Sequence, residues 1–320
     1  MKPFCKFIAL AALALTPSLA VAEKFPDGPV RVIIPFTPGG SNDTIGRYLG
    51  EGLSRTWGEA VVIENRPGAG SAIGSAHVAT SAPDGHTLLF VSGTYTTNAA
   101  TQANLPFDPL KDLQPVGLVA LGDRLIATGS RVSLPTLAVL AEKAKTEQIF
   151  YGTTGIGSST QFDTEFLSDV MGIKMTPVHY KGGSDALLDL AGGRLDVYVG
   201  SVTGLLPNIE SKTAVPVALM SKTRADSIPD VPTVSEAGFP AAETYIWWGV
   251  FAPAGTDPEI TGKINSDIFA VMATPEAEAF LKKNGLAVPH RLNVQEFTDH
   301  VSTEIARWKE LAARRNIVAE

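Results

Sequence analysis

The chain has 320 residues, of which 44% are hydrophobic, so it is long enough for two domains with packed cores. Its formal net charge of −7 gives no reason to expect nucleic acid or an anionic membrane surface as a partner. Any anion that the protein binds must therefore be held by local donors.

The first residues have the pattern of a secretory signal peptide. Two lysines precede an apolar run at residues 7–15, and a small-x-small cleavage site lies at residues 20–22. We expect residues 1–22 to be removed, and with them Cys5, the only cysteine. No later stretch approaches the ~18 apolar residues of a membrane span. We therefore predict an exported protein without disulfides or a membrane anchor.

The first strand and helix are joined by a glycine-rich turn. Residues 30–34 are β-branched and predict a buried strand, and residues 44–53 have apolar positions at helical spacing. Between them, the glycines of the turn allow backbone N–H groups to point outward at the helix start, where the dipole favours an anion. The same residues are also compatible with a plain turn. The candidate ligand-binding residues here are Phe36, Thr37, Pro38, Gly39, Gly40, Ser41, Asn42 and Asp43.

Two further strands follow in the first part of the chain. Residues 61–64 predict a strand, and the spacing Gly68-x-Gly70-x-x-x-Gly74 is superficially similar to a dinucleotide loop. It follows the second strand rather than the first, so we interpret it as a loop that enters a helix ending near residue 80. A strand at residues 86–91 delivers Ser92 and Thr94 to its carboxyl end, where ligands bind in open α/β sheets.

The stretch 149–163 repeats the strand, glycine-hydroxyl turn and helix pattern, with a helix that continues to residue 171. A serine or threonine at the helix start is an N-cap signal. Two helix starts suited to anions in one chain are stronger evidence than one. The candidates of this turn are Thr153, Thr154, Gly155, Gly157, Ser158, Ser159 and Gln161, and Ser201 and Trp247 complete the candidate set.

The order of elements predicts an α/β fold with two doubly wound domains joined by a two-crossing hinge. We assign residues 23–121 with 247–320 to domain 1 and residues 122–246 to domain 2. The remaining expected strands are 116–122, 125–128, 175–179, 196–200, 215–220 and 245–252, with Asp123-Arg124 separating the first two, and the remaining expected helices are 136–145, 184–191, 258–272, 276–283 and 294–314.

Seven motif blocks of this chain resemble those of one receptor family. They are Pro35-Phe-x-Pro-Gly-Gly-x-x-Asp43 with Arg47, Glu64-Asn-Arg-Pro-Gly-Ala-Gly70, Pro83-Asp-Gly-x-Thr-Leu-Leu89, Tyr151-Gly-x-x-Gly-x-Gly-Ser158, Tyr180-Lys-Gly-Gly183, Asp189-Leu-x-Gly-Gly193 and Phe251-Ala-Pro-Ala-Gly-Thr256. The family is that of the periplasmic solute-binding receptors of tripartite tricarboxylate transporters, also called Bug receptors, and the resemblance covers nearly the whole mature chain.

The resemblance implies a hinge-closing receptor, similar in fold to type II periplasmic binding proteins. Such a receptor captures a small carboxylate and delivers it to membrane permease subunits, and some relatives pass the signal to a sensor kinase. The resemblance also implies that loops 36–43 and 153–161 hold the ligand through N–H groups and hydroxyls, partly through waters. The chain departs from the family pattern at Gln161, where many relatives have His, at His86 and at Trp248, which leaves the ligand's identity open.

The leading hypothesis is that a dicarboxylate bridges the two helix starts. Trp247, Trp248, Tyr95 and Phe36 could flank an aromatic ring, and the alternative is that the tryptophans pack in the hinge strand. We expect a monomer that has a small-molecule carboxylate as its ligand and no cofactor.

Two other classes of protein are alternatives to this interpretation. An exported enzyme is disfavoured because there is no Gly-x-Ser-x-Gly elbow and no phosphate-binding Gly-x-x-x-x-Gly-Lys loop. No histidine pair has metal-ligand spacing, so we expect neither catalytic residues nor a metal. An anion receptor of an ATP-driven importer has the same architecture, and only the motif blocks disfavour it.

Overall fold

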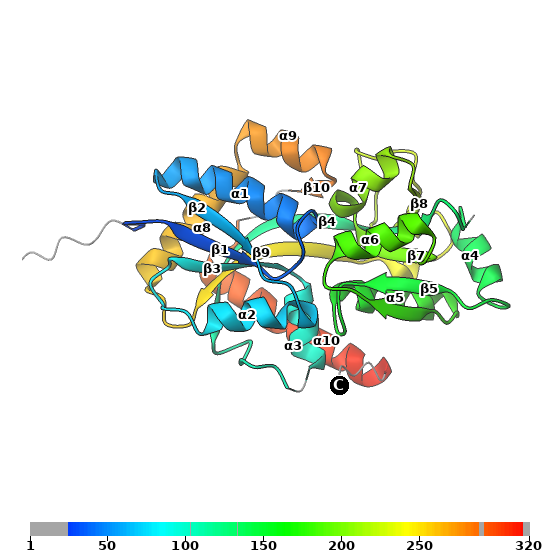
Figure 1. Cartoon of the computed structure of the whole chain (residues 1–320), viewed down its shortest axis with the longest axis horizontal. Helices are drawn as coiled ribbons and strands as arrows, with labels where there is room; N and C mark the ends of the chain where they lie inside the picture. The colour runs from blue at the N-terminus through cyan, green and yellow to red at the C-terminus, as the bar shows by residue number, and fades with distance from the viewer. Residues whose placement is uncertain (1–24, 103, 133, 288–290, 316–320) are drawn as a thin grey trace, which may run out of the picture.

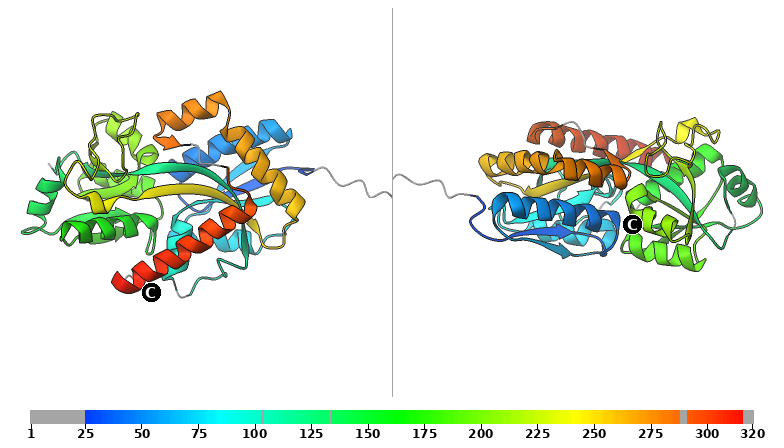
Figure 2. Two further views of the ribbon diagram at one scale, coloured as in Figure 1. Left: turned by 180° about the vertical axis from the view of Figure 1, so that it is seen from behind. Right: turned by 90° about the horizontal axis from the view of Figure 1, so that it is seen from above.

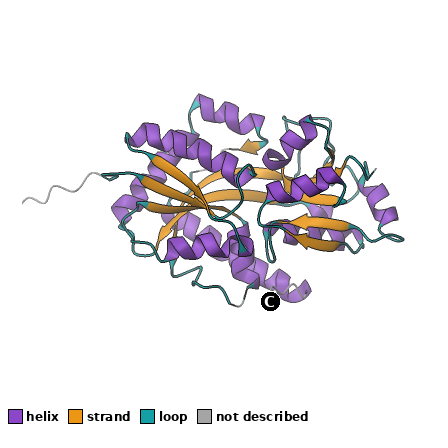
Figure 3. Cartoon of the chain, in the orientation of Figure 1, coloured by secondary structure: helices purple, strands orange, loops and turns teal. Residues whose placement is uncertain are grey.

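The computed structural model describes residues 25–315 except 103, 133 and 288–290, so the predicted signal peptide lies outside the described residues. Figure 1 shows two lobes side by side, with strands running between them. Figure 3 shows that helices cover both faces of the strands in each lobe. This is the α/β architecture that the element order predicts.

The first lobe is built from both ends of the chain. Its first three strands are parallel, and a later strand is added antiparallel to them. The elements are β1 (Val30–Ile34), α1 (Ser41–Trp57), β2 (Val61–Asn65), η1 (Ala69–Ser71), α2 (Ala72–Ala79), β3 (Thr87–Ser92), α3 (Thr94–Thr101), β9 (Tyr245–Pro253), α8 (Pro258–Met272), α9 (Pro275–Lys283), β10 (Leu286–Ala287) and α10 (Val294–Arg315).

The second lobe is built from the middle of the chain. Its strands β5, β6 and β7 are parallel, as the alternation of strands and helices predicts. The elements are α4 (Leu137–Lys143), β5 (Phe150–Thr153), α5 (Ser159–Met171), β6 (Thr176–His179), α6 (Gly183–Gly192), β7 (Val197–Ser201), α7 (Val202–Glu210), β8 (Ala214–Leu219) and η2 (Pro240–Ala242).

One long strand, β4 (Leu113–Gly129), belongs to both lobes. It pairs antiparallel with β9 as far as Asp123, and from Arg124 onward it pairs with β7 and β8. The sheet therefore runs β2-β1-β3-β9-β4-β7-β5-β6, with β10 and β8 paired to β4. The prediction of two strands separated by Asp123-Arg124 is wrong. The polar pair does not interrupt the strand, because the Arg124 side chain is buried against Asp163 of α5.

The core of the first lobe contains the large aromatic residues of β9. Trp247 and Trp248 are fully buried, and Trp247 meets the ring of Phe297 of α10 edge-on at a centroid separation of 5.7 Å. The indole N–H of Trp247 donates to Glu304 Oε2 at 2.6 Å. These contacts favour the interpretation that the tryptophans pack in the strand.

Helix α10 connects the two lobes in space. Seen from behind in Figure 2, it runs along the first lobe and ends beneath the second. There, Trp308 packs edge-on against Phe162 of α5, with ring centroids 5.6 Å apart. The apolar face of this helix includes Phe297, Val301 and Ile305, which are all buried.

The sequence did not indicate helices α3 and α7. The segment of α3 is rich in threonine, and hydroxyls of this helix bond back to earlier carbonyls, as Thr101 Oγ1 does to the carbonyl of Thr97 at 2.8 Å. Helix α7 contains Gly204 and Pro207, both poor helix formers. In each case, packing at the end of a buried strand outweighs the local propensity.

Candidate functional site

Five helix N-termini converge where the two lobes meet. Each of α1, α3, α5, α6 and α7 follows directly on a strand, so its first turn lies at the carboxyl end of that strand. Four of these N-termini have no hydrogen bond from their own N-cap side chain, and Ser201 caps the fifth. Free N–H groups and the positive ends of five dipoles therefore face one region. The sequence predicted three of these helices, α1, α5 and α6, but it indicated only the starts of α1 and α5 as suited to an anion.

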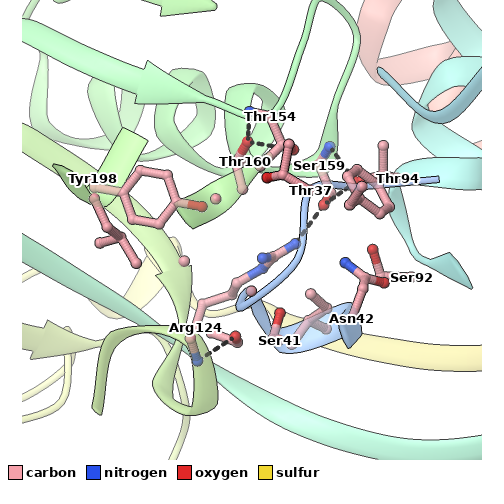
Figure 4. Close-up of a pocket in the computed structure, with 18 residues that line it drawn as sticks. Thr37, Ser41, Asn42, Ser92, Thr94, Arg124, Thr154, Ser159, Thr160 and Tyr198 are labelled. Atoms are coloured by element: carbon pink, nitrogen blue, oxygen red, sulfur yellow. Dashed lines mark hydrogen bonds between the residues drawn. The ribbon is translucent and has the colours of Figure 1, made fainter. Parts of the chain in front are cut away.

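A pocket lies in this region, and ten of the predicted residues line it. Figure 4 shows it as a polar cavity enclosed by both lobes. The predicted residues that the structure brings to it are Phe36, Thr37, Gly40, Ser41, Asn42, Ser92, Thr94, Thr154, Ser159 and Ser201. The pocket also has eight lining residues that sequence reasoning missed: Arg124, Thr160, Gly183, Leu187, Tyr198, Gly200, Gly204 and Ile246.

The wall formed by the first lobe is the start of α1. Gly40 is the N-cap in an extended conformation, and it leaves the N–H groups of the first turn without a side-chain acceptor. Asn42 Oδ1 is buried without a hydrogen-bond partner among the described residues. A buried polar group is normally satisfied, so an unpaired amide in a pocket wall indicates a place for a polar ligand.

The opposite wall is a network of hydroxyl groups at the start of α5. The Thr160 hydroxyl accepts from the N–H of Thr154 at 2.9 Å and lies 3.0 Å from Ser158 Oγ. Ser159 Oγ lies 2.9 Å from Thr94 Oγ1 of the first lobe, so hydroxyls of both lobes meet here. A hydroxyl can donate or accept, which lets this wall adapt to a bound carboxylate.

Arg124 is the one basic side chain among the residues that line the pocket. It is 2% exposed, its Nε lies 2.6 Å from Asp163 Oδ2, and its Nη2 donates to Ser159 Oγ at 2.7 Å. Burial raises the pKa of Asp163 to about 6, while Arg124 opposes that rise. Burial also raises the pKa of Tyr198 to about 12, so its hydroxyl stays protonated.

The lobes touch on both sides of the pocket. Thr37 Oγ1 lies 2.7 Å from Ser184 Oγ, and the Thr203 hydroxyl donates to the carbonyl of Asn284 at 2.8 Å. The cavity measures about 30 Å³, roughly twice the space that one water molecule requires. The structure therefore shows the lobes in a closed arrangement.

Nine predicted residues do not line the pocket, and their contacts explain why. Asp43 turns into its own lobe, where its carboxylate accepts from the N–H of Gly39, from Arg47 and from Asn65. Burial alone would raise the pKa of Asp43, but these hydrogen bonds hold it below its ordinary value. Gly39 itself adopts φ +85°, which serves the turn, and the neighbouring Pro38 is exposed.

The remaining predicted residues hold the second-lobe loop or fill a core. Gln161 Oε1 accepts from the N–H of Gly157 at 2.8 Å, so its side chain folds back on its own loop. Gly155 has φ +118°, and a Cβ there would lie 2.7 Å from Gly70 Cα, so it allows the lobes to approach. The other three residues are Thr153, bonded to His179, Ser158, bonded to Thr160, and Trp247, bonded to Glu304.

Some of the missed residues had a signal in the sequence. Gly183 ends the Tyr180-Lys-Gly-Gly183 block, and Thr160 continues the serine run at residues 158–159. Gly183 is required there because a Cβ would lie 2.8 Å from the Tyr198 hydroxyl. Leu187, Ile246 and Tyr198 lie on a helix or a strand with ordinary core residues, so their role follows only from the fold.

In the part of the chain that the structure describes, no group of three or more His, Cys, Asp or Glu residues could hold a metal ion. None of the described helices is long and apolar enough to cross a membrane.

The fold and the site define a two-lobed binding protein with a pocket suited to an anion between its lobes. The family model described as "Tripartite tricarboxylate transporter family receptor" matches residues 45–317, and the chain belongs to this family. The family assignment that the motif blocks suggested is thereby confirmed. Members of this family are receptors rather than enzymes.

Relatives and solved structures agree with this assignment. Protein BugT of Bordetella pertussis is 33% identical over 307 residues, which cover 94% of this chain and 93% of BugT. The periplasmic binding protein BugD superposes with a TM-score of 0.88 at 29% identity, covering 92% of this chain and 100% of BugD. Rpa4515 of R. palustris, solved with adipate, gives a TM-score of 0.88 at 30% identity, covering 92% and 99% of the two chains.

Proposed function

We propose that this protein is a periplasmic receptor that captures a short aliphatic dicarboxylate between its two lobes. It would deliver this ligand to the membrane subunits of a tripartite tricarboxylate-type transporter. The observation that carries the proposal is the convergence of five helix N-termini on one hydroxyl-lined pocket. N–H groups and hydroxyls at helix starts bind carboxylates without a separate counter-ion.

A ligand with two charged ends is favoured because the polar groups lie on opposite walls. Figure 4 shows Ser41 and Asn42 on one side of the pocket and Thr154 and Thr160 on the other. Adipate, which also has a carboxylate at each end, is the ligand in the solved structure of Rpa4515. An aliphatic ligand is favoured over an aromatic one because three of the four predicted flanking residues pack in the core of the first lobe instead of lining the pocket. These are Trp247, Trp248 and Tyr95, whereas Phe36 does line it.

The size of the pocket favours a short ligand. A dicarboxylate is larger than the roughly 30 Å³ of the closed cavity, so it must hold the lobes slightly farther apart. Micromolar affinity corresponds to about 8 kcal/mol, and each charge-assisted hydrogen bond contributes about 1.5–3 kcal/mol. A few such bonds at each end are sufficient even after the costs of ordering.

We propose that residues 23–121 with 247–320 and residues 122–246 are the two domains that move about the hinge. This division is supported by β4, which changes its partner from β9 to β7 between Asp123 and Arg124. Family membership favours a tripartite transporter over an ATP-driven importer as the recipient. A monomeric state and a sensor kinase as a second partner stay predictions.

The test is a binding screen with purified mature protein. Thermal shift and calorimetry with mono-, di- and tricarboxylates of matched chain length should show that dicarboxylates bind at least tenfold more tightly than monocarboxylates. Equal affinity for both classes would contradict the bridging model. Equal shifts for aromatic and aliphatic diacids would remove the aliphatic preference.

A pair of serines on α5 supplies a matched control for this screen. Ser159 lies in the pocket wall, whereas Ser168 is a buried serine whose hydroxyl donates to the carbonyl of Thr164 at 2.8 Å. Ser159→Ala should weaken dicarboxylate binding by about 2- to 10-fold, the value of one ordinary hydrogen bond. Ser168→Ala should leave the affinity unchanged, and an equal loss in both variants would show that the effect is structural.

A further inference from the structure

Arg124 has more donors than the protein itself uses. A guanidinium group carries five N–H donors in a fixed plane. Nε faces Asp163 and one N–H of Nη2 is taken by Ser159, whereas Nη1 has no hydrogen-bond or ion-pair partner among the described residues. Buried polar groups are normally satisfied, so a 2%-exposed arginine with unused donors in a pocket wall is unusual for a purely structural residue.

The remaining donors are placed for a carboxylate. Asp163 occupies the Nε edge from α5, so the Nη edge is the one left for the pocket. Two parallel N–H groups on neighbouring nitrogens match the two oxygens of a carboxylate, and this pairing is stronger than a contact to a neutral donor. Figure 4 shows the guanidinium of Arg124 between the two polar walls.

We propose that Arg124 is the charged anchor for one carboxylate of the ligand and that Asp163 is the residue that positions its guanidinium. This inference rests on the proposed function, because it names the group that one end of the proposed dicarboxylate contacts. An arginine side chain has many rotamers, and a buried ion pair to α5 restricts it to the one that faces the pocket. Asp163 acts through Arg124 and does not line the pocket itself.

Asp163 also adjusts the charge that the ligand meets. When it is ionised, it compensates Arg124, and the other charged groups that face the pair are Glu304 and Arg307 of α10. Tyr198 of β7 faces Arg124 as a neutral hydroxyl, and Thr244 donates to Asp163. Protonation of Asp163 would leave the positive charge of Arg124 uncompensated, so an anionic ligand should bind more tightly as Asp163 takes up a proton.

The experiment measures affinity by calorimetry for the best dicarboxylate of the screen. Arg124→Gln should bind it about 10- to 100-fold more weakly than the wild type. Arg124→Lys keeps the charge but not the planar arrangement of N–H donors. Its affinity should therefore lie between those of the wild type and Arg124→Gln. The matched control is Arg66→Gln, which breaks an ion pair to Glu64 with the same 2.6 Å separation but outside the pocket, and its affinity should not change.

The role of Asp163 is tested by the pH profile of the dissociation constant. The affinity of the wild type should fall as the pH rises from 5 to 7, and the fall should be larger than the change caused by titration of the ligand itself. Asp163→Asn binds the same ligand but has no titrating group at this position. Its affinity should therefore change with pH only as much as titration of the ligand requires. A variant that only perturbed the structure would keep the wild-type profile, and this result would overturn the positioning role.

The outcomes separate this inference from the function that it rests on. If the wild type binds no dicarboxylate, the proposed function fails. If the wild type binds and Arg124→Gln binds within twofold of it, the anchor inference fails while the function stands. Arg124→Gln leaves a buried carboxylate unpaired and could unfold, in which case the double variant Arg124→Gln, Asp163→Asn, which has no stranded charge, decides the question by the same criterion.

Discussion

Two opposing effects act on the carboxyl group of Asp163. The group is fully buried, which disfavours its charged form, and Glu304 adds a nearby negative charge, whereas Arg124 lies 2.6 Å away and favours the charged form. Burial prevails and raises the pKa to about 6 from an ordinary value of 3.8. We predict from this that the ionised form of Asp163 costs stability at neutral pH.

The sign and size of the effect follow from proton linkage. Because the pKa is higher in the folded state, the folded state binds the proton more tightly than the unfolded chain does. The contribution of protonated Asp163 to the free energy of unfolding is fully present below about pH 4, and it is lost as the pH rises to about 6. A shift of roughly two pKa units corresponds to about 3 kcal/mol.

The assay is urea unfolding of the wild type and of Asp163→Asn at several pH values between 4 and 7. Asparagine keeps the shape of the side chain but does not titrate, so the difference between the two proteins isolates Asp163. The free energy of unfolding of the wild type minus that of the variant should fall by up to about 3 kcal/mol from pH 4 to pH 7. Asp226→Asn, which removes an exposed partner of Lys282, should show almost no such trend.

A difference that instead increased with pH would refute the reasoning. It would mean that Arg124 lowers the pKa of Asp163 despite the burial, and that the ion pair stabilises the fold at neutral pH. A flat difference would mean that the two effects cancel. In both cases titration of Asp163 could no longer explain the expected pH dependence of ligand affinity.

Two further predictions concern the stability of the first lobe. Gly74→Ala in α2 should cost about 1–3 kcal/mol in urea or thermal unfolding, because the new Cβ would lie 2.7 Å from Pro35 Cβ and 3.0 Å from the carbonyl oxygen of Arg66. Gly262→Ala in α8 meets nothing within 4 Å and should be neutral or stabilising by up to about 1 kcal/mol, so equal effects at both sites would contradict the packing argument. Asp43→Asn should cost about 1–3 kcal/mol at neutral pH, since hydrogen bonds hold the pKa of Asp43 low and the ionised form stabilises the fold. That deficit should vanish as the pH falls through the folded-state pKa, and a deficit that stayed constant into acid would show that the charge is not its source.

The sequence indicated most strands and helices because their signals are local. Runs such as Val30–Ile34 are β-branched and end at proline or glycine, and α8 to α10 have a clear apolar face. The break expected at Asp123-Arg124 was wrong because the partner of Arg124 lies 39 residues away, on α5. A charged residue in a dipeptide such as Asp123-Arg124 can stay within a buried strand when an opposite charge is buried beside it. The local sequence does not show whether such a partner exists.

The pocket likewise contains residues with a local sequence signal and residues whose position depends only on the fold. Ser41, Asn42 and Ser159 follow glycine-rich turns at helix starts, so their place in the pocket could be predicted from the local pattern. Gln161 has the same local signal, but its amide folds back to the N–H of Gly157. Arg124 carries no local signal, because its position depends on the register of β4 against β7 and on Asp163.

The proposed binding of an anion is compatible with an acidic protein because the field in the pocket is local. A formal net charge of −7 is spread over a surface where salt screens interactions beyond about 8–10 Å. Each helix N-terminus carries the equivalent of roughly half a positive charge, and residues at the starts of five helices line one small cavity. Arg124 adds a full charge, which Asp163 compensates when it is ionised. The net charge of the chain therefore does not argue against the anionic ligand that we propose.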